Sequence, residues 1–170
     1  SRTDFDLKAH EEFSGRKLQY FDTEENKSYT PYVVETSVGL DRMFLSVFAT
    51  SLQEEELEDG STRTVLKLPS VLAPTKAAVL PLIKRDGLPE IAKQIMADLK
   101  WDFSVTYDEK DAVGRRYRRQ DAIGTPLSIT VDHESLQDNS VTIRDRDTMQ
   151  QERVAIADLP TIIAEKLKLK

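Results

Sequence analysis

The sequence contains no cysteine, which excludes disulfides, thiolate catalysis and cysteine-based zinc sites. Histidine is almost as scarce: His10 and His133 lie far apart along the chain, so we expect no metal site. No apolar run approaches the roughly 20 residues that cross a membrane, and no signal-peptide pattern is present. A glycine-rich phosphate loop and a Ser–His pair suited to nucleophilic catalysis are missing as well.

The 170 residues that are present comprise 39% hydrophobic and 32% charged side chains, which is typical of a globular protein. The formal charge of −6 is unevenly distributed, because residues 1–60 carry −8 and residues 61–170 carry +2. Positive charge is concentrated in residues 110–119, with five cationic side chains and one acidic side chain. This concentration favours a local contact with an anion over a general coating of nucleic acid.

The first 60 residues predict a β-hairpin followed by a helix. Leu18 and Tyr20 mark one strand, and the polar residues 22–28 have turn chemistry. Residues 32–34 predict a second strand, which is apolar enough for burial on both faces. Helical spacing of apolar residues then predicts a helix with a face made of Leu40, Met43, Phe44, Val47 and Phe48. The chain has no initiator methionine, and we expect it to be a piece of a longer protein.

The acidic, glycine-containing residues 54–61 are the best candidate for a domain boundary, although their first half also fits a solvated helix end. We therefore divide the chain into residues 1–60 and residues 61–170. The second part predicts a mixed α/β fold, with a sheet of about five strands flanked by helices.

Particular residues place the elements of that second part. A buried strand at residues 77–83 contains Pro81, which is tolerated only at an edge or a bulge. A helix from Pro89 and a strand at residues 103–107 imply a right-handed parallel crossover. The remaining elements are a helix from about 111 to 124, two strands at 127–131 and 141–143 that pair antiparallel, and a last helix after residue 158.

Residues 35–42 offer the clearest chemistry. Glu35 lies in an apolar stretch, where a carboxylate needs either a structural partner or a bound cation such as a substrate ammonium. Arg42 lies in the first turn of the predicted helix, and its planar guanidinium and the helix N-terminus both suit a phosphate. A surface ion pair is the alternative for Arg42.

The basic stretch combines cations with an aromatic ring, as RNA-binding surfaces do. On one helix Arg115 and Arg119 share a face while Arg116 lies elsewhere, so only part of the cluster can meet one ligand. Pairing of some arginines with Asp111 and Asp121 is an equally good interpretation. A second run, residues 144–147, alternates arginine and aspartate and could either read base edges or neutralise itself.

The strand, glycine turn and arginine-bearing helix of residues 32–42 resemble the third conserved motif of class II aminoacyl-tRNA synthetases. Residues 2–22, with Arg2-Thr3-Asp4-Phe5-Asp6-Leu7, are similar to the segment before that motif in dimeric glycyl-tRNA synthetases. Residues 65–82, 114–126 and 141–149 resemble the anticodon-binding domain of the same family. The resemblance covers essentially all 170 residues, and motifs one and two of the class are not in the chain.

The resemblance implies a role for each matching position. Arg42 would be the catalytic arginine that holds the γ-phosphate of ATP, and Gly39 would give the nucleotide room beside the backbone. Glu35 and Ser37 would line the glycine pocket, where Glu35 holds the ammonium; Thr36 departs from the proline often found there. The candidate anticodon-binding residues are Arg115, Arg116, Tyr117, Arg119, Arg144 and Asp145.

The implied activity is that of a glycine–tRNA ligase, which activates glycine with Mg²⁺-ATP and transfers it to tRNA(Gly). The family resemblance implies a cytoplasmic homodimer with no membrane or DNA partner. Residues 1–60 would be the tail of the antiparallel catalytic domain, and residues 61–170 the anticodon-binding domain. Without motifs one and two we expect these 170 residues alone to be inactive and to hold no cofactor. The alternative is a non-catalytic RNA- or protein-binding module that retains an anticodon-binding-type domain.

Overall fold

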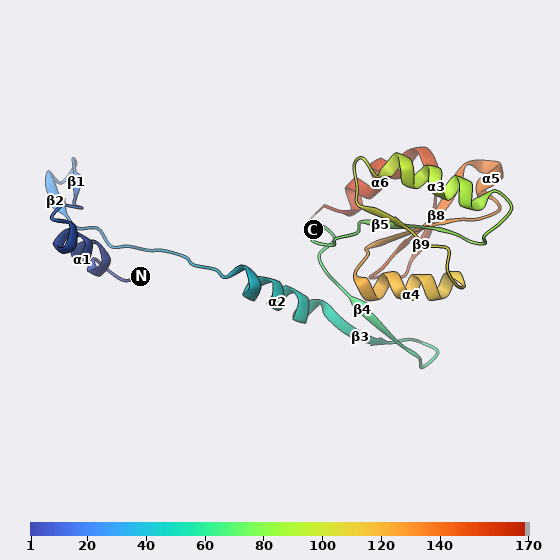
Figure 1. The fold of residues 1–170 in the computed structure, drawn as a ribbon, viewed down its shortest axis with the longest axis horizontal. Coiled ribbons are helices and arrows are strands. Elements are labelled where there is room, and N and C mark those ends of the chain that lie inside the picture. The colour runs from blue at the N-terminus through green and yellow to red at the C-terminus, as the bar shows by residue number, and fades with distance from the viewer. Residues whose placement is uncertain (169–170) are drawn as a thin grey trace. The chain divides into compact units, whose positions relative to one another are not determined.

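The computed structural model describes residues 1–168 and divides the chain into two compact units, Ser1–Met43 and Phe44 onward (Figure 1). The division falls inside helix α2 (Leu40–Ser51). The acidic residues 54–61 lie instead in and around the turn of a hairpin, β3 (Leu52–Glu56) and β4 (Thr62–Leu66), within the second unit. No helix in the described part of the chain is long and apolar enough to span a membrane.

The first unit consists of one helix and one small hairpin. Helix α1 (Phe5–Ser14) was not expected from the sequence; it ends at Gly15, whose φ of 68° requires the left-handed backbone that glycine adopts most easily. A hairpin forms here, but it pairs β1 (Tyr20–Asp22) with β2 (Lys27–Tyr29), so its second strand lies within the predicted turn and not at residues 32–34. No residue of this unit is buried, so it has no hydrophobic core of its own.

Residues 32–34 do not form the predicted buried strand. Val33 exchanges backbone hydrogen bonds only with Arg2 and Thr3, and the side chains of Tyr32 and Val34 are 70% and 79% exposed. A strand needs neighbours on both sides to be buried, and the described residues supply only this short contact. Helix α2 is confirmed, but its predicted apolar face is also largely exposed, with Leu40 at 82% and Phe44 at 68%.

The second unit is built on the predicted mixed sheet of five strands, in the spatial order β6-β5-β7-β8-β9. Strands β5, β6 and β7 are parallel, whereas β8 and β9 are antiparallel to their neighbours. The strands span Ala77–Pro81 (β5), Val105–Tyr107 (β6), Leu127–Val131 (β7), Ser140–Asp145 (β8) and Gln151–Ala155 (β9). The sequence did not predict β9, which has only one partly buried side chain.

The two faces of this sheet are covered by different helices, with α3 and α6 on one side and α4 on the other (Figure 1). The helices span Leu88–Leu99 (α3), Val113–Ile123 (α4), Ser135–Asp138 (α5) and Leu159–Lys166 (α6). The face under α3 and α6 is an apolar core, to which Ile95, Leu99 and Ile163 contribute. The residues that α4 buries on the other side are polar, namely Arg116, Gln120 and Asp121.

Pro81 is the last residue of β5, a central strand, and not at a sheet edge as predicted. The next residue, Leu82, donates its N–H to Val131 of β7, so the Pro81 nitrogen faces the β6 side. The pairing with β6 ends at Val79, and the ladder therefore requires no donor from Pro81. The missing N–H costs no hydrogen bond at this position.

Arg153 on β9 ties this edge of the sheet to the α5 region. Its Nη1 contacts Asp132 Oδ2 at 2.6 Å, and its Nη2 contacts Asp138 Oδ1 at 3.3 Å. Hydrogen bonds from Ser140, joined by those from Arg153, lower the pKa of Asp138 to about 2. Because the unfolded value is about 3.9, this carboxylate stabilises the fold above that pH and loses its contribution as pH falls toward its folded pKa.

We therefore expect Asp138→Asn to flatten the pH dependence of unfolding between about pH 4 and about pH 2. The wild-type free energy of unfolding should fall more steeply across this window than that of the variant. Urea titrations at several pH values would measure both slopes. Asp102→Asn, a change at an exposed aspartate, is the control and should keep the wild-type slope; equal slopes for wild type and Asp138→Asn would contradict the assignment.

Candidate functional site

Residues 35–42 do not enclose a pocket within the described part of the chain. Glu35 is exposed and lines a shallow hollow together with Arg2, Asp6 and His10. Ser37, Gly39 and Arg42 do not line this hollow and are also exposed.

Gly39 and Arg42 are nevertheless neighbours. A Cβ at Gly39 would lie 3.8 Å from Cγ of Arg42, so the arginine stem already occupies the space beside the glycine. Asp41 and Arg42 lie in the first turn of α2, as the sequence predicted. The residues predicted for ATP and glycine are therefore close in the chain but do not by themselves surround a ligand.

Arg116, a predicted anticodon contact, is buried inside the second unit, with only 2% of its surface exposed. Its Nη1 donates to the carbonyl of Pro81 at 2.6 Å and to that of Asp108 at 3.2 Å, and its Nη2 donates to the carbonyl of Leu82 at 3.1 Å. Burial lowers the pKa of Arg116. The guanidinium thus fills the end of the sheet where β6 stops pairing with β5, and it is not available to RNA.

Arg144, another predicted contact, is also buried, at 5% exposure. Its two terminal nitrogens donate to the two oxygens of Asp121 at 2.8 and 3.1 Å, a bidentate pair. Its guanidinium carbon lies 4.8 Å from the centre of the Tyr117 ring, and Tyr117 Oη hydrogen-bonds Thr130 Oγ1 at 2.6 Å. The predicted base readers Arg144 and Tyr117 therefore hold α4 against the sheet.

Two further buried arginines extend this network to the β3–β4 hairpin. Arg63 of β4 donates from Nη1 to Asp121 at 3.0 Å and from Nε to Glu55 at 2.7 Å. The pKa of Glu55 is lowered mainly by the hydrogen bond from Lys67 and further by the hydrogen bond from Arg63. Arg146 donates to the backbone carbonyls of Leu66, Leu68 and Gly124 at 2.8 to 3.0 Å. Arg63 was not singled out from the sequence, whereas self-neutralisation of residues 144–147 was one of two interpretations, and Arg146 does pair with Asp147 at 2.8 Å.

Asp145 and Arg119 are likewise engaged within the protein. The Asp145 carboxylate accepts hydrogen bonds from the backbone N–H groups of Asp147 and Thr148 at 2.9 Å, which shapes the β8–β9 turn. Arg119 pairs with Asp108 at 2.8 Å and with Asp111 at 3.0 Å, as the structural interpretation of the cluster anticipated. These hydrogen bonds raise the pKa of Arg119 and fasten the loop after β6 to α4.

Arg115 is the one predicted arginine of α4 that is exposed and has no ion pair among residues 1–168, and Arg118 shares this state. Both line a surface groove between α4 and β4, together with Thr62, Thr64 and Ala122. Guanidinium and hydroxyl groups along a groove suit the phosphates of a nucleic acid. Arg115 and Arg118 form the candidate interface and are called the arginine row below.

The fold is that of a domain found in aminoacyl-tRNA synthetases. The prolyl-tRNA synthetase of Cryptosporidium parvum superimposes with a TM-score of 0.57 at 21% identity, covering 67% of this chain and 29% of that chain. The sequence profile described as the anticodon binding domain matches residues 76–166, and the chain belongs to this family.

Curated relatives extend the likeness to almost the full chain. The glycine–tRNA ligase of Geobacillus kaustophilus is 53% identical over 167 residues, and that of Macrococcus caseolyticus is 49% identical over 168 residues. These alignments cover 98% and 99% of this chain but only 36% of each relative, so the chain spans about a third of their length. The resemblance to glycyl-tRNA synthetases predicted from sequence is confirmed.

Proposed function

We propose that this chain is part of a glycine–tRNA ligase that activates glycine with Mg²⁺-ATP and transfers it to tRNA(Gly). One observation carries the proposal: about 50% identity to such ligases runs through residues of both compact units. Residues 1–60 then belong to the catalytic domain and residues 61–170 to the anticodon-binding domain. The complete enzyme would be a cytoplasmic homodimer.

The exposed apolar surface of the first 50 residues supports this assignment. Phe13, Leu40 and Phe44 are each at least two-thirds exposed, at 94%, 82% and 68%. Leu40 and Phe44 lie one turn apart on α2, and an exposed apolar helix face is characteristic of a surface that is covered in a larger assembly. In the complete ligase, neighbouring strands of the catalytic domain would cover it and would close the pocket around Glu35 and Arg42.

For the anticodon-binding domain, we propose that the arginine row contacts the phosphates of tRNA. Arg115→Ala/Arg118→Ala in the complete ligase should weaken tRNA(Gly) binding by roughly ten- to a hundredfold at low salt. The slope of log Kd against log salt should also decrease by about one for each phosphate that the variant no longer neutralises. Filter binding over a salt series would measure both quantities.

The matched control removes the same charge elsewhere on the domain. Lys84 and Arg85 follow β5 and are exposed, and Arg85 only approaches Asp86 at 3.8 Å. Lys84→Ala/Arg85→Ala should leave the salt slope unchanged. Equal weakening by the two double variants would mean that net charge, and not the arginine row, attracts the RNA.

A further inference from the structure

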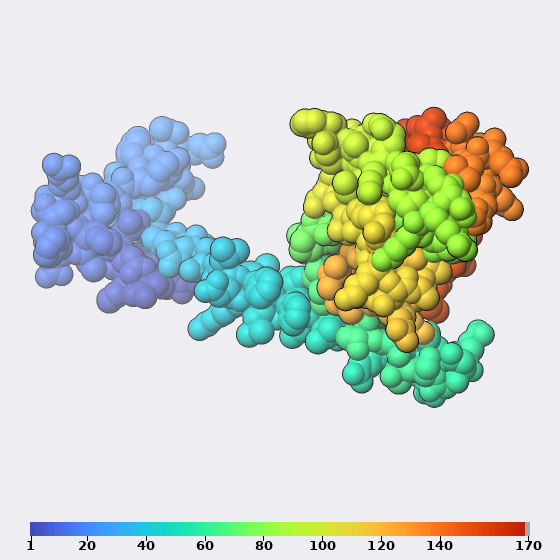
Figure 2. Space-filling view, turned by 45° about the vertical axis from the view of Figure 1, so that its right-hand side comes forward, coloured from blue at the N-terminus to red at the C-terminus, as the bar shows by residue number. Residues whose placement is uncertain are grey.

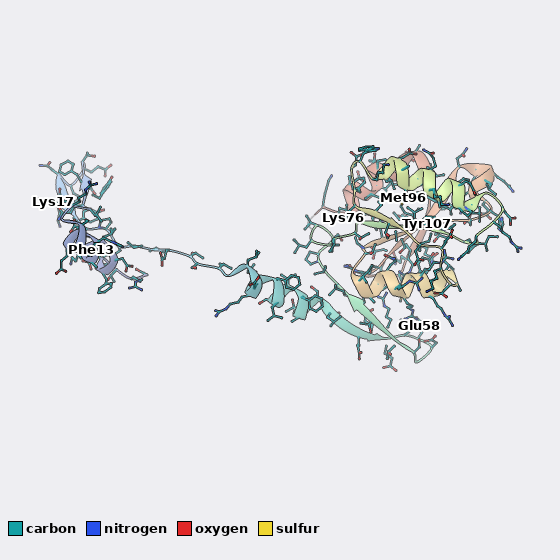
Figure 3. The ribbon with its side chains drawn as sticks, viewed as in Figure 1. Phe13, Lys17, Glu58, Lys76, Met96 and Tyr107 are labelled. Atoms are coloured by element: carbon teal, nitrogen blue, oxygen red, sulfur yellow. The ribbon has the colours of Figure 1, made fainter. Side chains whose placement is uncertain are left out.

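The turn between β3 and β4 carries two carboxylates on the hairpin that packs against α4, the helix that bears the arginine row. β4 packs along α4, and both the ribbon and the space-filling view show the hairpin next to this helix (Figure 2). Glu58 and Asp59, called the acidic turn below, are exposed at the end of the hairpin. Figure 3 shows Glu58 on the α4 side of the molecule, at the hairpin turn.

The acidic turn is held in place by its own hydrogen bonds. Asp59 Oδ1 accepts hydrogen bonds from the backbone N–H of Ser61 at 2.9 Å and from its hydroxyl at 2.6 Å. Gly60 has a φ of 76° and donates its N–H to the carbonyl of Leu57 at 2.9 Å. The hairpin itself is fastened by Arg63, which pairs with Asp121 of α4. The Asp59 carboxylate is therefore fixed at the turn of a hairpin that is itself anchored to α4.

The negative charge of the acidic turn and the positive charge of the arginine row act on each other. The hydrogen bonds from Ser61 lower the pKa of Asp59 first, and the positive charge of Arg118 lowers it further. No ion pair forms between Asp59 and Arg118 in the structure, so the guanidinium stays open to a stronger ligand. A phosphate entering the groove would meet an attractive arginine and a repulsive carboxylate at the same time.

Resting on the proposed tRNA contact, we propose that the acidic turn competes with RNA phosphates for the arginine row. The negative charge of the acidic turn is autoinhibitory, because it limits the affinity of the arginine row for the phosphate backbone of RNA. Phosphate contacts carry no sequence information, so they strengthen binding to every RNA alike. By weakening them, Glu58 and Asp59 leave a larger share of the binding energy to contacts that distinguish one tRNA from another.

The test neutralises the acidic turn while keeping its geometry. Glu58→Gln/Asp59→Asn retains the Oδ1 acceptor for Ser61 and removes two negative charges. In the complete ligase this variant should bind both tRNA(Gly) and an unrelated tRNA roughly three- to tenfold more tightly at about 50 mM salt. The gain should shrink at about 200 mM salt, because the Debye length shortens.

The control makes the same charge change away from the groove. Asp102 and Glu165 are exposed and line a different hollow, between the loop after α3 and α6. Asp102→Asn/Glu165→Gln should leave tRNA affinity within twofold of wild type. Equal tightening by both neutralised variants would overturn the proposal, because overall charge alone would then explain the effect.

Combining the changes separates this proposal from the interface itself. If the acidic turn acts through the arginine row, Glu58→Gln/Asp59→Asn should lose its effect in an Arg115→Ala/Arg118→Ala background. If Arg115→Ala/Arg118→Ala lowers tRNA affinity but Glu58→Gln/Asp59→Asn does not raise it, the proposed competition is overturned. The proposed RNA interface on α4 would still stand. No effect from the arginine variant would refute the interface, and the competition with it. Thermal unfolding of each variant would verify that it folds.

Discussion

An Asp121→Asn variant of the 170-residue chain is expected to lose about 3–5 kcal/mol of unfolding free energy. Asp121 is fully buried and is the shared acidic partner of Arg63 and Arg144. Asparagine keeps the shape of the side chain but removes its charge, so it leaves the buried guanidinium of Arg144 without a counter-charge and that of Arg63 with Glu55 alone. Because the change creates no cavity, the loss would report electrostatics and hydrogen bonding and not packing.

Urea unfolding followed by far-ultraviolet circular dichroism would measure this effect. Asp102→Asn, an identical change at an exposed aspartate, should alter stability by less than about 0.5 kcal/mol. If Asp121→Asn were equally harmless, the buried arginines would not depend on Asp121. The network would then have to be held mainly by the backbone carbonyls that accept from Arg63 and Arg146.

The second large effect concerns Arg42 in the complete ligase. If Arg42 holds the γ-phosphate of ATP, Arg42→Ala should slow glycine-dependent pyrophosphate exchange on the order of a hundred- to a thousandfold. The affinity for tRNA(Gly) should stay close to wild type, because the proposed RNA contacts lie on α4. Measurement of both quantities on one preparation separates a ligase from a binding module.

Arg16→Ala is the matched control, since Arg16 is exposed, lies in the same compact unit and has no ion pair among residues 1–168. It should leave the exchange rate unchanged. An Arg42→Ala enzyme with a normal rate would favour the alternative hypothesis of a non-catalytic RNA- or protein-binding module. The assignment of Glu35 and Ser37 to the glycine pocket would lose its support at the same time.

The apolar half of the sheet domain could be predicted from sequence because its residues repeat with the period of their element. Ile91, Ile95 and Leu99 recur at helical spacing, and β5 is buried along its whole length. Two of the missed strands, β3 and β9, lack such a pattern, because four of the five side chains in each are exposed. An exposed strand needs no apolar side chain, so its pairing is visible only in three dimensions.

The candidate RNA interface was predicted only in part, because a sequence shows charge but not burial. The basic stretch of α4 is one continuous run, yet the helix turns Arg116 inward and leaves Arg115 outward. The carbonyls that satisfy Arg116 belong to residues 81, 82 and 108, which nothing in the sequence connects to it. One signal was available in part: pairing of the basic stretch with Asp111 and Asp121 was one of its two interpretations. Asp111 does pair with Arg119, whereas Asp121 pairs with Arg63 and Arg144, which lie outside that stretch.

The contrast between the two faces of the sheet has a consequence for the response of the domain to temperature. Burial of apolar surface weakens on cooling, so the layer formed by α3 and α6 should loosen first in the cold. The cost of removing ions from water falls as temperature rises, and the arginine–aspartate network under α4 should hold relatively better when the domain is warmed. One sheet thus joins a cold-sensitive layer to a heat-tolerant one.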